Sequence, residues 1–122
     1  MSSVGDIKNE LKKLSTEHKI EISAIVSRSG VPIAWNVPDE SMVETFATLS
    51  ATIVGAAEVV YTGLGKAPPK RIMIDSDGGT FIATPIGTKA LLVGISSNRD
   101  RASLSSGLDA VANAVKGVLS SE

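Results

Sequence analysis

Histidine and cysteine, two side chains that often act as general bases, nucleophiles and metal ligands, are nearly missing from this sequence. It has one histidine, His18, and no cysteine. The serines Ser103, Ser105 and Ser106 have no base nearby, and no Gly-x-Ser-x-Gly motif occurs. A single histidine cannot form a two-histidine metal site. With one histidine and no cysteine, we also find no set of nucleophile, base and orienting group. We therefore predict no catalytic, cofactor-binding or metal site, and a protein that is not an enzyme.

Two short motifs resemble ligand-binding loops but lack residues that those loops need. Residues 63–66, Gly-Leu-Gly-Lys, match the end of a phosphate-binding loop, but Val60 stands where glycine is needed and Ala67 where serine or threonine is needed. Residues 75–78, Asp-Ser-Asp-Gly, match the start of a calcium loop, but its twelfth position is Ile86 instead of glutamate. We predict a helix C-terminus at the first motif and a hairpin turn at the second.

Composition narrows the class of protein further. The 122 residues have the size of one domain, which we place at 1–122. A net charge of -1 gives no attraction for nucleic acid or an anionic membrane, and only 3% of the residues are aromatic. No stretch approaches the ~20 apolar residues of a membrane-spanning helix. Without cysteine the chain needs no oxidising compartment, so we expect a cytoplasmic protein that neither binds nucleic acid nor inserts into a membrane.

Apolar periodicity predicts three helices and five strands. Apolar residues three to four positions apart indicate a helix, and alternation indicates a strand. In chain order we expect a helix over 4–14, strands over 20–26 and 31–35, a long helix over 39–63 capped by Asp39, strands over 70–75, 80–86 and 90–95, and a closing helix over 104–119 capped by Asn98. Short connections and one helical crossover then predict an α/β fold with a single sheet and helices on both faces.

Two of the expected strands have features of a sheet edge, and one has features of a sheet centre. Pro32 cannot donate a ladder hydrogen bond, so the second strand should lie at an edge. Residues 72–75 contain no proline, glycine or lysine to protect a free edge, so this strand should be able to pair with another strand. Residues 90–95 are apolar on both faces, which suits a central strand.

The long helix carries two apolar stripes, which we name the first and the second stripe. The first stripe consists of Met42, Phe46, Leu49, Ile53, Ala56 and Val60, and the second of Val43, Ala47, Ser50, Val54, Ala57 and Tyr61. Two stripes favour two packing partners, although one broad contact inside the protein remains an alternative. Small residues at Ala47, Ser50, Ala51 and Gly55 would let another helix approach closely.

A symmetric dimer would use both the unprotected strand and the additional stripe. In such a dimer the third strand pairs with its twin and the two long helices lie side by side about one two-fold axis. An internal strand with other neighbours is the alternative. The predicted interface consists of Phe46, Ala47, Leu49, Ser50, Ile53, Val54, Ala57, Arg71, Ile72, Met73, Ile74 and Asp75.

The order of these motifs resembles the Roadblock family, which is named for a dynein light chain. The resemblance rests on the hairpin at 29–34, the end of the alanine-rich helix at 63–65, the strand at 71–74, and the runs at 82–87 and 90–93. It implies a five-stranded antiparallel sheet of order 2-1-5-4-3, with the first and last helices on one face and the long helix on the other. It also implies a homodimer that binds a Ras-like small GTPase.

This resemblance leads to a functional hypothesis of a non-enzymatic homodimeric regulator or scaffold. The GTPase would dock on the more polar positions of the long helix, which are Glu44, Thr48, Thr52, Glu58 and Thr62. No arginine lies in this helix, so ordering of the GTPase's own catalytic residues is favoured over an arginine finger. A small-ligand sensor domain with a pocket between layers is the alternative function.

Overall fold

The computed structural model describes residues 3–120. Its helices are α1 (Ser3–His18), α2 (Val43–Gly63) and α3 (Arg101–Ser120), and a 3-10 turn (Glu40–Met42) precedes α2. Its strands are β1 (Ile22–Ser27), β2 (Pro32–Asn36), β3 (Ile72–Ser76), β4 (Gly79–Ile86) and β5 (Ala90–Ser96). The predicted sequence of elements is therefore confirmed.

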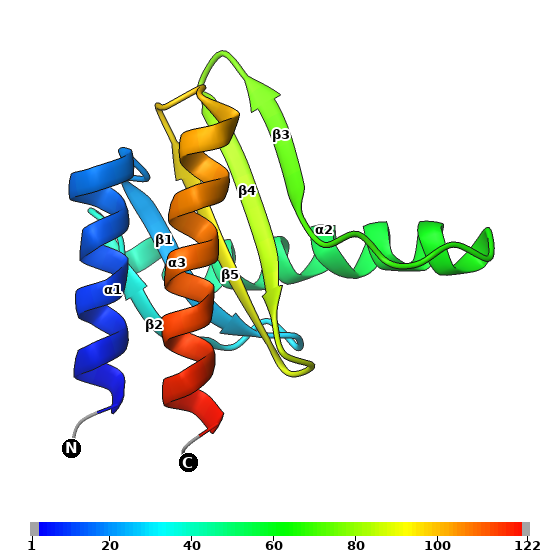
Figure 1. The fold of residues 1–122 in the computed structure, drawn as a ribbon, viewed down its shortest axis with the longest axis horizontal. Coiled ribbons are helices and arrows are strands. Elements are labelled where there is room, and N and C mark those ends of the chain that lie inside the picture. Colours follow the sequence, from blue (N-terminus) through cyan, green and yellow to red (C-terminus); the bar gives the residue numbers. More distant parts are fainter. Residues whose placement is uncertain (1–2, 121–122) are drawn as a thin grey trace.

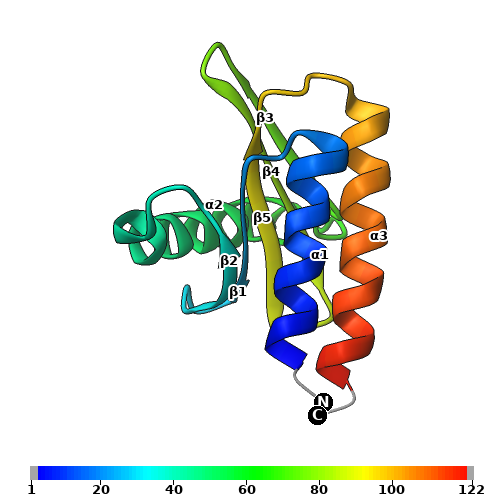
Figure 2. The same ribbon diagram turned by 90° about the vertical axis from the view of Figure 1, so that its left-hand side faces the viewer.

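The five strands form one antiparallel sheet in the order β2-β1-β5-β4-β3. The predicted edge positions of β2 and β3 and the central position of β5 are confirmed. Helices α1 and α3 lie side by side on one face of the sheet, and α2 crosses the opposite face (Figures 1 and 2). Strand β5 is buried almost along its whole length because helices cover it on both faces.

The face under α1 and α3 carries the larger core. Its buried members include Ile25, Ile82 and Leu92 from the sheet. Both helices contribute large branched side chains at helical spacing, namely Ile7, Leu11 and Leu14 from α1 and Leu104, Leu108, Val111 and Val115 from α3. Each of these helix residues is at most 3% exposed. This face is therefore closed by residues of the protein itself.

The closing helix begins with a different cap from the predicted one. The carboxylate of Asp100 accepts hydrogen bonds from the backbone N–H groups of Ala102 and Ser103, which makes Asp100 the cap. Asn98 accepts instead from the N–H of Asp100 and donates to the carbonyl of His18. The prediction of Asn98 as the cap is therefore wrong, because this amide joins the loop to the end of α1. Asp39, predicted to cap the long helix, caps the 3-10 turn before it, since its carboxylate accepts from Ser41, whereas α2 itself has Met42 at its N-cap position and no side-chain cap.

The segment Glu40–Gly63 corrects one expectation about membranes. Within the described residues this is the one helical segment long and apolar enough to cross a membrane by length and composition. Core helices of soluble proteins meet the same criterion. What sets this helix apart is that a large part of its apolar surface is exposed, as described below.

Candidate functional site

The two apolar stripes of α2 have different surroundings. Val43, Ala47, Ser50 and Val54 of the second stripe are buried against the sheet. In the first stripe, Phe46 packs partly buried against the sheet, whereas Met42, Leu49 and Val60 are 55%, 57% and 58% exposed. The alternative of one broad contact inside the protein is thereby excluded for these three exposed residues. Apart from Phe46, this helix buries side chains no larger than valine on the sheet and leaves its large apolar ones outside, the reverse of an ordinary amphipathic helix.

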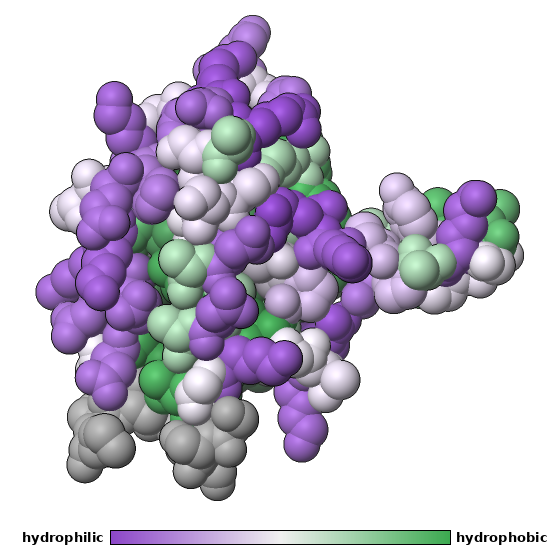
Figure 3. All heavy atoms as spheres, viewed as in Figure 1, coloured by the Kyte–Doolittle hydropathy of each residue, from purple (hydrophilic) through white to green (hydrophobic). Residues whose placement is uncertain are grey.

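The second half of α2 extends beyond the sheet. The buried residues of this helix all lie between Val43 and Val54. Beyond them the helix projects past β3, so its end has no sheet beneath it (Figure 1). Apolar side chains are exposed at this projecting end, where they lie among polar ones (Figure 3). The exposed apolar residues of this segment include Val59 and Leu64, each 70% exposed. An apolar projection of this kind is typical of a surface that another protein covers.

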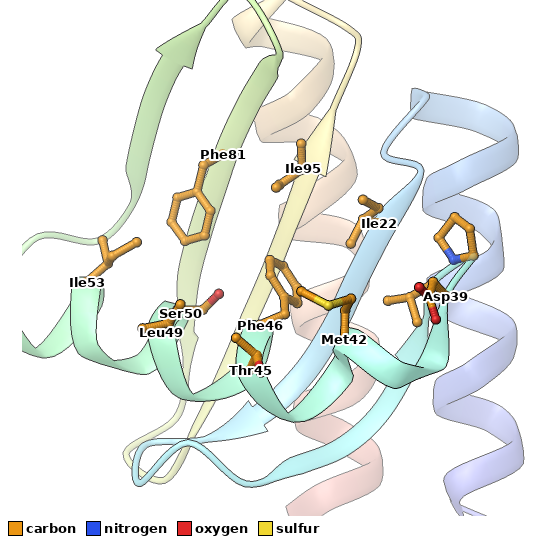
Figure 4. A pocket seen from close by; sticks show the side chains of 12 residues that line it. Ile22, Asp39, Met42, Thr45, Phe46, Leu49, Ser50, Ile53, Phe81 and Ile95 are labelled. Atoms are coloured by element: carbon orange, nitrogen blue, oxygen red, sulfur yellow. The ribbon is translucent and has the colours of Figure 1, made fainter.

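An apolar groove lies between the first stripe and the sheet. Its volume is about 520 Å³. Figure 4 shows Phe46 and Leu49 of α2 and Met42 of the preceding 3-10 turn on one side of the groove. On the other side Ile22, Ile95 and Phe81 form a row across β1, β5 and β4. The same row continues in β3 as Ile74, which is 43% exposed.

Strand β3 has β4 on one side and, among the described residues, no strand on the other. Arginines nevertheless hold it in place. Arg71 pairs with Asp109 of α3, and Arg101 pairs with Asp75 at 3.1 Å. Arg99 donates to the backbone carbonyl of Ser76 at 3.1 Å. The free edge is therefore an ordered strand.

The predicted dimer-interface residues divide into two groups. Phe46, Leu49 and Ile53 border the groove, and Ala57, Arg71, Ile72, Met73, Ile74 and Asp75 are half-buried or exposed. Ala47, Ser50 and Val54 are at most 2% exposed because they pack under α2 against the sheet. These three residues, together with Ala51, bring α2 close to its own sheet. The prediction that Ala47, Ser50 and Ala51 face another helix is therefore corrected, and only Gly55 among the small residues lies away from other atoms.

Four of the five predicted partner-surface residues are exposed, namely Glu44, Thr48, Thr52 and Thr62. The hydroxyls of Thr52 and Thr62 donate back to carbonyls of the preceding helical turn. Glu58 differs, because its carboxylate accepts from Arg28 at 2.6 Å and is half-buried. Arg28 follows β1, so this ion pair joins the first hairpin to the second half of α2. Helical periodicity alone gave no sign of it.

The structure also places the fragments that resemble catalytic or ligand-binding sites. The N–H groups of Leu64, Gly65 and Lys66 bond to carbonyls of the last helical turn, so they are not free to hold a phosphate. Residues 75–78 form the predicted hairpin between β3 and β4. His18 lies 3.3 Å from the hydroxyl of Ser103, and that hydroxyl also accepts from Asn98. No carboxylate orients this histidine within residues 3–120, and that range holds no metal-binding cluster.

Comparison with known proteins agrees with this architecture. The chain resembles the gliding protein MglB of Thermus thermophilus, with a TM-score of 0.88 at 16% identity, covering 100% of this chain and 94% of the other. For a Roadblock/LC7 domain of Streptomyces avermitilis the TM-score is 0.82 at 14% identity, with 93% and 98% covered. For profilin IB of Acanthamoeba castellanii the TM-score is 0.63 at 16% identity, covering 90% of this chain and 96% of the other. At such identities the likeness shows the fold alone.

Sequence comparison supplies the family. No curated protein sequence matches the chain. The family model of the Roadblock/LC7 domain matches residues 7–96, which include all five strands and α2. The chain belongs to the Roadblock/LC7 domain family.

Proposed function

We propose that this protein is a homodimeric regulator or scaffold for a Ras-like small GTPase. The observation that carries the proposal is the unsatisfied apolar surface of α2 beside the free edge of β3. A strand edge and an apolar helix stripe on the same side of a molecule are both completed by one two-fold axis. Membership of the Roadblock/LC7 family favours a GTPase as the further partner.

The GTPase is proposed to bind Glu44, Thr48, Thr52 and Thr62, with Glu58 at the border of this surface. These side chains lie on a flank of α2 other than the first stripe, so dimer formation leaves them accessible. All four arginines of the chain already bind groups of the protein itself: Arg28 binds Glu58, Arg71 binds Asp109, Arg101 binds Asp75, and Arg99 binds the carbonyl of Ser76. An effect on hydrolysis would therefore come from ordering the GTPase's own catalytic residues.

The dimer is tested first, by light scattering on the wild type and on Met73→Pro. Proline has no N–H and blocks strand pairing. The expected result is a wild-type dimer and a folded Met73→Pro monomer. A wild-type monomer at all concentrations would contradict the proposed dimer.

GTPase binding is tested with Ras-like GTPases from the same genome, loaded with GDP or a non-hydrolysable GTP analogue. We expect binding that depends on the nucleotide. The double variant Thr48→Arg, Thr52→Arg should lose this binding and stay dimeric, because it adds bulk and charge outside the dimer contact. Unchanged affinity in this variant would reject the docking surface.

The groove gives specific support to a second candidate function, a sensor of a small apolar ligand. Its volume of about 520 Å³ falls in the range of ligand pockets. Its polar lining is limited to Asp39, Thr45 and Ser50, so few groups could orient a ligand. A rise in melting temperature with fatty acids or aromatic metabolites, absent in Leu49→Glu, would support this function.

A further inference from the structure

The direction of the backbone groups along β3 follows from its hairpin. Ser76 and Gly79 face each other across a two-residue turn, so they exchange hydrogen bonds and close the ladder. Bonded and non-bonded pairs alternate along an antiparallel ladder, so even-numbered residues of β3 bond to β4. The N–H and C=O groups of Arg71, Met73 and Asp75 therefore point away from β4. These three residues form the free edge.

The charges on this free edge are symmetric in position and opposite in sign. Arg71 and Asp75 lie two residues before and after Met73, and all three side chains share the face toward α3. Arg71 binds Asp109 and Asp75 binds Arg101. Each charge is thus held in place by a helix of the same protein. The Nε atom of Arg71 is buried and has no hydrogen-bond partner.

We propose that this edge pairs with β3 of a second copy in one register, with Met73 facing the partner's Met73 on the two-fold axis. This inference rests on the dimer proposed above and fixes its geometry. In this register Arg71 faces the partner's Asp75, and each facing pair exchanges both of its backbone hydrogen bonds. Charges then alternate in sign across the interface, from Asp109 and Arg71 to the partner's Asp75 and the partner's Arg101.

The same register completes the contacts of two groups that the single chain leaves partly open. The Arg71 side chain is 24% exposed in the single chain, and the partner's Asp75 adds a second carboxylate to its guanidinium beside Asp109. On the opposite face, Ile72 stands across from the partner's Ile74, a cross-strand apolar pair. Ile74 is 43% exposed in the single chain and becomes covered.

The other registers each carry a defect. Centring the axis on Arg71 or Asp75 places like charges directly opposite each other. Centring it on Ile72 brings Asp75 opposite the partner's Pro69, which has no N–H to donate. Centring it on Ile74 brings Arg71 opposite the partner's Asp77, which lies in the turn beyond the strand. Only the axis at Met73 uses the whole free edge.

Mixing two charge variants tests the register. A homodimer of Arg71→Asp sets two carboxylates against each other at both contacts, and a homodimer of Asp75→Arg sets two guanidinium groups there. The mixed dimer restores opposite charges at both contacts. We expect the mixed dimer to form about tenfold more strongly than the homodimers, and 1 M salt to remove this preference. Each variant loses its own internal ion pair in every combination, so the preference reports only the contacts between subunits.

Cysteine cross-linking gives an independent measurement, because the chain has no native cysteine. Facing Cα atoms of a bonded pair lie about 5.5 Å apart, within disulfide range, whereas residues one position off the axis exceed about 7 Å. Under mild oxidation Met73→Cys should form a covalent dimer at least about tenfold faster than the matched control Ile74→Cys.

Light scattering on the wild type separates the two proposals. A wild-type dimer with random mixing of the charge variants and faster cross-linking of Ile74→Cys would overturn the register and leave the dimer intact. A wild-type monomer would overturn both.

Discussion

The two faces of the sheet are built on opposite plans. On one face α1 and α3 insert large side chains such as Leu11 and Leu108 between themselves and the sheet. On the other face the fully buried side chains of α2 are no larger than valine, Phe46 packs there only partly buried, and Met42 and Leu49 are turned toward solvent. The first arrangement completes a core within one chain. The second leaves apolar surface uncovered, and this difference is what the proposed dimer explains.

The connections between elements follow the same division. The closed face is joined by hydrogen bonds around the end of α1, where Ser96 donates to the carbonyl of Lys19 at 2.6 Å and Asn98 to the carbonyl of His18 at 3.2 Å. The projecting half of α2 has one ion pair with the rest of the chain, between Arg28 and Glu58, among the described side chains. We therefore expect substitutions to act on folding at the closed face and on association at the open face.

The largest expected contrast is between Leu92→Ala and Leu49→Ala. Leu92 is fully buried in the core of the closed face, so its truncation should lower the free energy of unfolding by about 2–5 kcal/mol. Leu49 is 57% exposed, so its truncation should change the stability of the dilute monomer by less than about 0.5 kcal/mol. Urea unfolding at low concentration measures both values.

Light scattering on the same two proteins completes the comparison. Leu49→Ala should weaken the dimer, because it removes apolar area from the proposed contact. If Leu49→Ala instead costs as much folding stability as Leu92→Ala, the open face is part of the core of the single chain.

Two helical glycines give the next contrast. A Cβ added at Gly107 would lie 2.7 Å from the ring of His18, so Gly107→Ala must displace this ring between α1 and α3. We expect a loss of about 1 kcal/mol in the free energy of unfolding, since the steric cost exceeds the gain in helix propensity. A Cβ at Gly55 meets nothing within 4 Å, so Gly55→Ala should stabilise the dilute monomer by about 0.5–1 kcal/mol. Thermal unfolding of both variants checks the signs.

A smaller and local effect is expected at the ion pair between Arg28 and Glu58. Both side chains are partly exposed, at 33% and 23%, so solvent screening limits the contribution of the pair to about 0.5–1 kcal/mol. Glu58→Gln should speed hydrogen exchange of the amides at the end of α2 and leave exchange in α3 unchanged. Equal acceleration in both helices would show that the ion pair supports the whole fold.

Much of the fold could be predicted from the sequence, because strands and helices leave local signals. Pro32 marked one edge of the sheet, and the apolar run at 90–95 marked its centre. The two stripes of α2 were also visible as periodicity. The sequence did not show which stripe faces the sheet. Both stripes are apolar, and the choice depends on how small residues such as Ala47 fit against the strands.

Contacts between distant residues explain the remaining differences. Glu58 appeared to be a free surface position, but it binds Arg28, which is 30 residues away. Asn98 had the composition of a cap, but it bonds to His18, 80 residues away, and leaves the capping to Asp100. A helix pattern carries no information about such partners, since they depend on how the elements pack.

The smallest predicted effect lies on the closed face, at Glu21. Burial raises the pKa of this carboxyl, but hydrogen bonds from the hydroxyl and the N–H of Ser97, helped by Lys19, outweigh burial and lower the pKa below its ordinary 4.5. A lowered pKa in the folded state contributes stability above pH 4.5, and this contribution is lost as the pH falls through the lowered value. Since Glu21 is exposed, the contribution should stay under about 1 kcal/mol. Urea unfolding should find Glu21→Gln slightly less stable than the wild type at pH 7 and equal to it near pH 3; a difference that persists at pH 3 would assign the effect to packing instead of charge.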